Sequence, residues 1–159
     1  MSANWLETRF NTANGMVNSV YSKYSLVVHK DAERELDSLW DLDEAAAADI
    51  TILLETLQES QDLLDRLSSH GFVQYQEPAI DISKWISQQR SQKRNLWRLK
   101  LVAFANSGTY AYRVIYAFHP TEHRYYVLGI LKRDFDYDPE HPTSKRIIAA
   151  YEQLGIPDY

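Results

Sequence analysis

The chain of 159 residues contains no cysteine, and it has only five glycines and five prolines. The lack of cysteine excludes disulfides, thiolate metal sites and a cysteine nucleophile, and it fits a reducing compartment. Few glycines and prolines, with 45% hydrophobic residues, argue against disorder. No apolar run approaches the ~20 residues that a membrane span needs, and residues 1–23 lack the apolar core of a secretory signal. We therefore expect one cytoplasmic domain with no membrane partner.

Acidic residues are also missing from one long stretch, between Asp81 and Glu122. Residues 31–65, in contrast, hold twelve acidic residues and a single basic one. The formal net charge of −5 therefore conceals a strong segregation of charge, which predicts a cationic face that meets a polyanion. The seven basic residues of the acid-free stretch are Lys84, Arg90, Lys93, Arg94, Arg98, Lys100 and Arg113.

Hydrophobic periodicity predicts a strand and two helices in the first half of the chain. Residues 1–23 read as an N-terminal extension, and the β-branched and aromatic run 24–29 reads as a strand. Asp31 is expected to cap a first helix and Asp43 a second, whose apolar stripe continues toward Gly71. Together these helices form an α-hairpin. Residues of about 61–92 lack a clear pattern, and we interpret them as an insertion into a single domain over 24–159.

Three strands and a closing helix are predicted in the second half. The strands cover residues 95–105, 110–119 and 124–132, with turn residues at 106–108 and 120–122. Such short connections force an antiparallel meander. Pro142 suits the first turn of the last helix. The predicted order β, α, α, β, β, β, α defines an α+β fold.

The meander resembles the RelE/ParE superfamily of bacterial toxins from type II toxin–antitoxin systems. The residues that carry the resemblance are Trp97-Arg98-Leu99-Lys100-Leu101, then Tyr112-Arg113-Val114-Ile115-Tyr116, then Leu128-Gly129-Ile130-Leu131-Lys132-Arg133 and Tyr137. It covers residues 24 to about 137. The resemblance implies a RelE-like fold, in which an N-terminal strand and a helical hairpin pack on a small twisted antiparallel sheet. It also implies a toxin that a cognate antitoxin protein neutralises. RelE-like members cleave mRNA on the ribosome, and ParE-like members inhibit DNA gyrase.

By position, the resemblance places the catalytic set at Arg98, Lys100, Arg113, Arg133 and Tyr137. Cleavage by a 2′-hydroxyl needs a base, stabilisation of the phosphate and an acid. Arg113 and Arg133 suit the phosphate, because the guanidinium fork matches two oxygens. Lys100 is the expected base and Tyr137 the acid or a surface for base stacking.

The remaining cations are expected to bind the RNA backbone. Arg98 would hold the backbone at the site, and Lys84, Arg90, Lys93 and Arg94 would extend the contact. His141 is a reserve acid. We expect no cofactor and no metal, since His119 and His123 flank a turn, where a solvated pair is the simpler reading.

Several alternatives remain open from the residues alone. Arg98 and Lys100 alternate with apolar residues, as on any half-exposed strand, and Arg113 could be a structural ion-pair partner. Depending on the turn, Arg113 lies opposite Val102, on the face of Arg98 and Lys100, or opposite Leu101, on the other face. The chain could also be a gyrase inhibitor, or a toxin-fold binding module without enzymatic activity whose acidic hairpin docks a basic partner.

Overall fold

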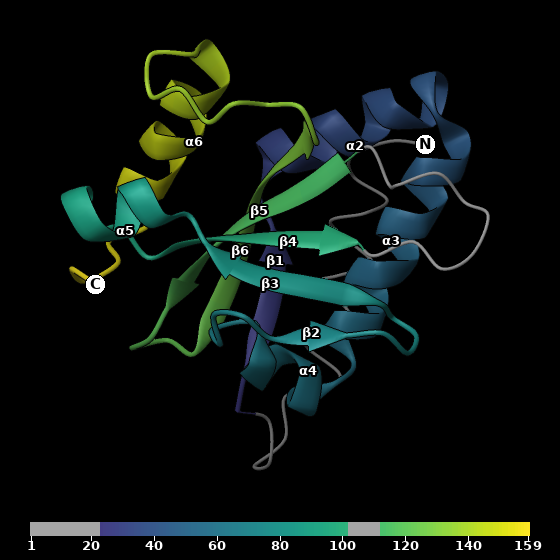
Figure 1. The fold of residues 1–159 in the computed structure, drawn as a ribbon, viewed down its shortest axis with the longest axis horizontal. Helices are drawn as coiled ribbons and strands as arrows, with labels where there is room; N and C mark the ends of the chain where they lie inside the picture. The colour runs from purple at the N-terminus through teal and green to yellow at the C-terminus, as the bar shows by residue number, and fades with distance from the viewer. Residues whose placement is uncertain (1–22, 102–111) are drawn as a thin grey trace.

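A six-stranded mixed sheet forms the centre of the protein (Figure 1). The computed structural model describes residues 23–101 and 112–159. The strands lie in the order β1-β6-β5-β4-β3-β2. Their bounds are β1 Ser25–Val28, β2 Val73–Gln74, β3 Ile80–Lys84, β4 Leu96–Leu101, β5 Tyr112–His119 and β6 Arg124–Lys132.

The α+β class is confirmed, but the expectation of an antiparallel sheet is wrong for one strand. β1 pairs with β6 in parallel, while the other neighbouring strands pair antiparallel. Short turns force antiparallel pairing, whereas β1 reaches the sheet edge through a long connection that permits either direction. Among the predicted elements, β6 has the expected bounds, and β5 lies within the expected range. The predicted turn at 106–108 and residues 1–22 of the predicted extension at 1–23 lie outside the described residues.

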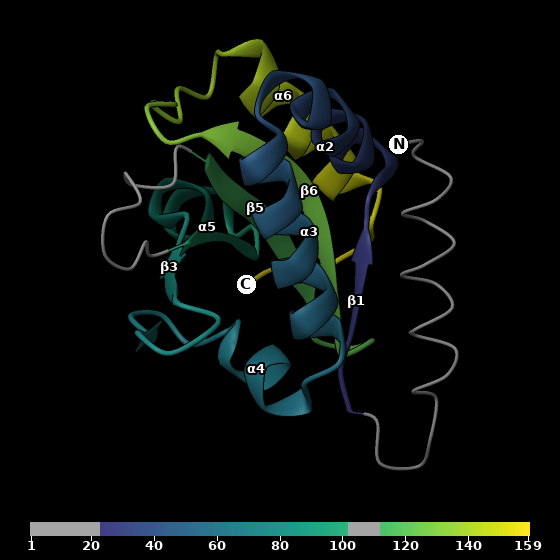
Figure 2. The same cartoon turned by 90° about the vertical axis from the view of Figure 1, so that its right-hand side faces the viewer.

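Three helices cover one face of the sheet (Figure 2). They are α2 Lys30–Leu42, α3 Glu44–Gln58 and α4 Gln61–Arg66. The core between these helices and the sheet holds leucines of all three helices together with Trp97, Tyr116 and Tyr125 of the strands. Burial of this much apolar surface is the main stabilising term of the fold. The predicted hairpin of two helices is therefore present as α2 and α3.

The helix ends show how the local sequence defines these elements. α2 begins one residue before the expected cap: the His29 imidazole Nδ1 accepts from the Asp31 N–H at 3.1 Å, so the cap is His29 and not Asp31. Asp43 caps α3 as predicted, accepting from the Ala46 N–H at 3.1 Å. The expected continuation of this helix to Gly71 is wrong, because Ser60 starts α4 with a new N-cap.

The opposite face carries α5 Ile86–Gln92 and α6 Pro142–Glu152. Pro142 stands at the start of α6, as predicted. A second apolar cluster joins α6 to the sheet through Ile147 and Tyr151, which pack with Ile115 and Leu128. Because these helices cover only part of this face, polar residues of β3, β4 and β5 occupy the rest.

The segment interpreted as an insertion is built into the sheet. It supplies α4, β2, β3 and α5, and β3 pairs along its whole length with β4. The two strands in it were not predicted. Their pairing places Asp81 beside Lys100 and Ser83 beside Arg98. No helix within residues 23–101 and 112–159 is long and apolar enough to cross a membrane.

The two helical layers are tied together beyond the end of β1. The Glu35 carboxylate of α2 accepts from the Ile130 N–H at 3.1 Å and from Arg146 of α6 at 2.9 Å. Arg146 also donates to the Leu128 carbonyl at 3.1 Å. Burial raises the pKa of Glu35, and Arg146 opposes that rise. These side chains satisfy backbone groups of β6 beyond the residues that pair with β1, and they fix α6 against the sheet.

Candidate functional site

The register of β4 and β5 brings three predicted cations onto one face. Lys100 pairs directly with Arg113, and Arg98 pairs with Ile115. Directly opposed residues share a face, and alternate residues of β4 share it too. Both partners considered for Arg113 from the sequence, Val102 and Leu101, are therefore wrong. The shared face of Arg98, Lys100 and Arg113, one of the two alternatives, is confirmed.

Tyr137 lies against the two arginines of this face. The guanidinium carbons of Arg98 and Arg113 lie 5.0 Å and 6.0 Å from the centre of the Tyr137 ring. Arg113 Nη1 also donates to the Tyr137 hydroxyl at 3.3 Å. Cation–π contacts favour this arrangement. We call Arg98, Lys100, Arg113 and Tyr137 the Tyr137 cluster.

The Tyr137 ring is held by aromatic neighbours. Trp85, just before α5, and Phe135 each make an edge contact with it, at ring-centre distances of 5.2 Å. The Tyr137 backbone has a φ of 61°, in the left-handed region that non-glycine residues rarely adopt. Such a conformation persists only where the surrounding contacts impose it, and it concentrates at functional sites. The packing therefore presents the phenol to the arginines at a conformational cost.

Each arginine of the cluster has its own environment. Arg98 is half-buried, and its Nε donates to the Ser83 hydroxyl at 3.2 Å. Arg113 is also half-buried, but its Nε is buried without a hydrogen-bond partner among the described residues. A buried donor without a partner costs free energy.

Asp81 belongs to the site, although it was not predicted from the sequence. Its carboxylate lies 3.5 Å from the Lys100 ammonium, and about a third of each side chain is exposed. Ser83, two residues on, contacts Arg98 from the same strand. Ile80 and Ile82 alternate with Asp81 and Ser83, which is the pattern of a half-buried strand. This pattern is the signal that could have placed Asp81 and Ser83 on one face of the sheet.

Two predicted residues are not brought into the cluster. Arg133 is exposed in the turn after β6 and makes no ion pair or hydrogen bond within the described residues. His141 caps α6, its Nδ1 accepting from the Thr143 N–H at 3.1 Å, and its ring contacts Phe135 at 4.9 Å. His141 thus borders the aromatic neighbours of Tyr137 rather than the arginines.

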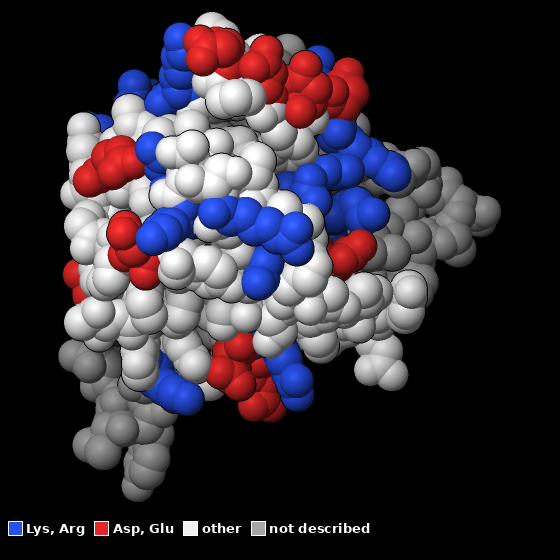
Figure 3. All heavy atoms as spheres, turned by 60° about the vertical axis from the view of Figure 1, so that its left-hand side comes forward, with Lys and Arg blue, Asp and Glu red and all other residues white. Residues whose placement is uncertain are grey.

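The remaining predicted RNA-binding residues lie around α5. Arg90 and Lys93 are exposed, and the Lys84 ammonium lies 5.2 Å from the Tyr159 ring centre. Arg94 is already engaged, since its Nε pairs with Glu152 at 2.7 Å and its Nη1 donates to Gln88 at 2.8 Å. Figure 3 shows Lys and Arg in a band across this face, with acidic side chains in a row at its upper edge.

The histidines and the acidic loop have structural explanations. His119 is buried, so the prediction of a solvated turn pair is wrong for it, and its Nδ1 accepts from the Glu122 N–H at 3.3 Å. In the loop after β6, Asp136 and Asp138 each accept from a backbone N–H two residues further on. Within residues 23–101 and 112–159, no group of three or more His, Asp or Glu is arranged to hold a metal.

Comparison with known proteins gives no match: no family model, no curated protein and no solved structure is similar to this chain.

Proposed function

We propose that the chain is a RelE-like toxin that cleaves mRNA on the ribosome. The observation that carries the proposal is the Tyr137 cluster, in which two guanidinium groups flank a phenol and a lysine lies opposite one of them. Guanidinium groups recognise phosphate oxygens, and a tyrosine ring beside them is a stacking surface for a base. Each of these four residues comes from the pattern that resembles the RelE/ParE superfamily.

In the proposed mechanism, Arg113 stabilises the phosphate as negative charge develops on it. Its half-buried guanidinium is held at the Tyr137 hydroxyl, so it is a preorganised donor for an equatorial oxygen. Arg98, fixed by Ser83, holds the adjacent backbone phosphate. Tyr137 donates a proton to the leaving 5′-oxygen, and its hydroxyl is oriented by Arg113 at 3.3 Å.

The Lys100–Asp81 pair supplies the base in this proposal. A charged ammonium stabilises phosphate but cannot accept a proton, whereas the carboxylate 3.5 Å away can. The 2′-hydroxyl therefore gives its proton to the Asp81 carboxylate. The Lys100 ammonium stabilises the negative charge that develops on the phosphate. Arg133 is exposed and outside the cluster, so its role is confined to contact with the RNA backbone.

The proposal includes a compartment and partners. The toxin acts in the cytoplasm, where ribosomes and mRNA are found, and a cognate antitoxin protein neutralises it. Lys84, Arg90 and Lys93 extend the positive surface along α5 toward the ribosome or the mRNA backbone. Arg94 fastens α5 to α6 instead, through its pair with Glu152.

Controlled expression with pulse labelling tests the proposal. We expect growth arrest in which incorporation of amino acids stops before incorporation of thymidine, and cleaved mRNA that maps to translated codons. An arrest of DNA synthesis with continued translation would favour a ParE-like gyrase inhibitor instead. Normal growth and intact mRNA would favour a binding module without enzymatic activity.

A further inference from the structure

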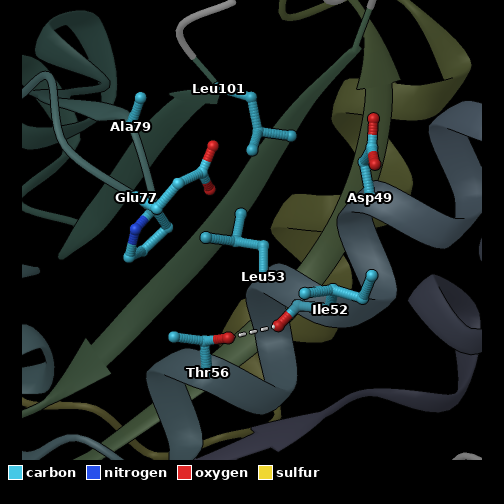
Figure 4. Close-up of a pocket in the computed structure, with 8 residues that line it drawn as sticks. Asp49, Ile52, Leu53, Thr56, Glu77, Ala79 and Leu101 are labelled. Carbon is cyan, nitrogen blue, oxygen red and sulfur yellow. Dashed lines mark hydrogen bonds between the residues drawn. The ribbon is translucent and has the colours of Figure 1, made fainter.

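A groove with an apolar floor and two carboxylates lies on the face opposite the Tyr137 cluster. It has a volume of about 380 Å³ and lies between α3 and the segment before β3 (Figure 4). Leu53 and Leu101 form part of its lining and belong to the main core, with exposed fractions of 2% and 7%. The remaining lining residues are Asp49, Ile52, Thr56, Glu77, Pro78 and Ala79.

The groove is bordered by an apolar side chain that is open to solvent. Ile52 on α3 is 61% exposed, although it is a large aliphatic residue. The hydroxyl of Thr56, one turn further along α3, is satisfied by the Ile52 carbonyl at 2.7 Å. Ile52 therefore adds exposed apolar surface beside the two leucines of the floor, against which an apolar side chain of a partner can pack.

The charge of the groove is negative and uncompensated. Asp49 and Glu77 stand on different walls (Figure 4), and neither has an ion pair or hydrogen bond through its side chain in the described part of the chain. No lysine or arginine lines the groove within these described ranges. Further along the same helical layer, Glu59 and Asp62 are exposed as well. A cationic ligand would therefore be steered to this side of the molecule.

We infer that this groove binds a helical segment of a partner protein that carries large apolar side chains flanked by lysine or arginine. The apolar anchor would extend the contact with Ile52, Leu53 and Leu101, while the flanking cations would pair with Asp49 and Glu77. The groove is open at its rim, which suits a protein segment laid across α3. This inference does not depend on catalysis by the Tyr137 cluster, which lies on the other face of the sheet.

Methyl NMR of the full chain with synthetic peptides tests the inference. The probe is a short helical peptide with leucine on one face and lysine on the other, and the control peptide has glutamate in place of lysine. We expect the lysine peptide to shift the methyl signals of Ile52, Leu53 and Leu101 first, and the glutamate peptide to bind much more weakly. No shift at these methyls, or equal binding of both peptides, would overturn the inference.

Matched variants separate the groove from general attraction between opposite charges. Asp49→Asn with Glu77→Gln removes both groove carboxylates and should weaken binding roughly three- to tenfold. Glu59→Gln with Asp62→Asn removes the same charge outside the groove. This variant should change the affinity for the lysine peptide less than about twofold. Ile52→Ser, at an exposed position, should also weaken binding. Equal losses in the two charge variants would refute a specific groove.

A second copy of the chain is the competing occupant. If it filled the groove, the Ile52 methyl signal would shift with protein concentration in the absence of peptide, and this result would replace the inferred partner. RNA cleavage is unaffected by the groove variants under our inference. The two proposals therefore fail separately: loss of peptide binding leaves the toxin proposal intact, and a lack of nuclease activity leaves the groove intact.

Discussion

Lys100 on β4 lies directly opposite Arg113 on β5. Like charges in such a cross-strand pair are destabilising, by an amount comparable to the ~0.2–1 kcal/mol that a favourable pair contributes. Asp81, on the other side of Lys100, offsets part of this repulsion with a contact of 3.5 Å. Arg113 has no acidic partner within the described residues. A bound phosphate would supply the missing negative charge, which is why we propose that the pair serves a function.

Replacing Arg113 should separate stability from activity. We expect Arg113→Met to keep the free energy of unfolding unchanged or to raise it by up to about 1 kcal/mol, because it removes the repulsion with Lys100. Loss of one preorganised donor should reduce the rate of RNA cleavage roughly 10²–10³-fold. Denaturant unfolding and a single-turnover cleavage assay on ribosomes measure the two effects.

Arg133→Ala is the matched control, since it removes the same charge from the turn after β6. Its effect on cleavage should be less than about tenfold, because the side chain is exposed and outside the Tyr137 cluster. A stable Arg113 variant with full activity would remove this residue from the site. A larger loss from Arg133→Ala than from Arg113→Met would mean that the arrangement of the cluster does not define the site.

Removal of the Tyr137 hydroxyl tests its role as a proton donor. Tyr137→Phe keeps the ring between Trp85 and Phe135, so RNA affinity should change less than about twofold. The cleavage rate should fall roughly 10²-fold, as expected for loss of a general acid. Tyr126→Phe, which removes a hydroxyl bonded to Glu122 on the exposed surface, is the control. Reduced affinity with an unchanged rate would assign Tyr137 to stacking alone.

Much of the fold could be predicted from local patterns. β6, β5 and α6 follow from alternation, turn residues and Pro142, because these signals are contained in a few neighbouring residues. The parallel pairing of β1 could not be read from the sequence, since strand direction depends on distant elements. β3 was missed for a different reason: it is only five residues long and follows Pro78 closely, so the alternation of Ile80 and Ile82 with polar residues is a short signal.

The site shows the same division between local and distant information. The resemblance to RelE-like toxins selects five residues, of which Arg98, Lys100, Arg113 and Tyr137 lie together and Arg133 does not. The register of Arg113 could not be derived, because the sequence permits turns of different length between the two strands, and a change of one residue moves Arg113 to the other face. The ion pair of Arg94 with Glu152 also joins residues far apart in the chain, so no local pattern shows that this cation is engaged.

His29 should make stability depend on pH. Burial lowers the pKa of His29 below its ordinary value of 6.5, and Asp31 only partly opposes this. The unfolded chain therefore binds the proton more readily, and protonation favours unfolding. The stabilisation is complete above pH 6.5 and is lost as the pH falls through the lower pKa of the folded state. Protonation of Nδ1 also ends its N-cap bond to Asp31.

The corresponding measurement compares the Tm of the parent chain and His29→Asn at neutral and acidic pH. An N-cap contributes about 1 kcal/mol. Its loss when His29 is protonated should therefore lower the Tm of the parent chain by roughly 2–4 °C. His29→Asn keeps a capping oxygen and should lose this part of the pH dependence. His123→Asn is the control at an exposed turn position with a φ of 52°, and this variant should keep the full pH dependence of the parent chain. Equal pH profiles for the parent and His29→Asn would contradict the assignment.

Binding of single-stranded RNA should depend on salt through the free cations near α5. Arg90 and Lys93 are exposed, whereas Arg94 is held by Glu152. Arg90→Gln with Lys93→Gln should reduce the slope of log affinity against log salt by about 0.7 for each phosphate that the variant no longer neutralises. Arg94→Gln should leave the slope unchanged and cost up to about 1 kcal/mol of stability. Titrations by fluorescence anisotropy at several salt concentrations measure the slopes.

If Arg94→Gln reduced the slope as much as the double variant, the ion pair of Arg94 with Glu152 would have to open on RNA binding. An unchanged slope in the double variant would place the RNA away from α5, nearer to the Tyr137 cluster.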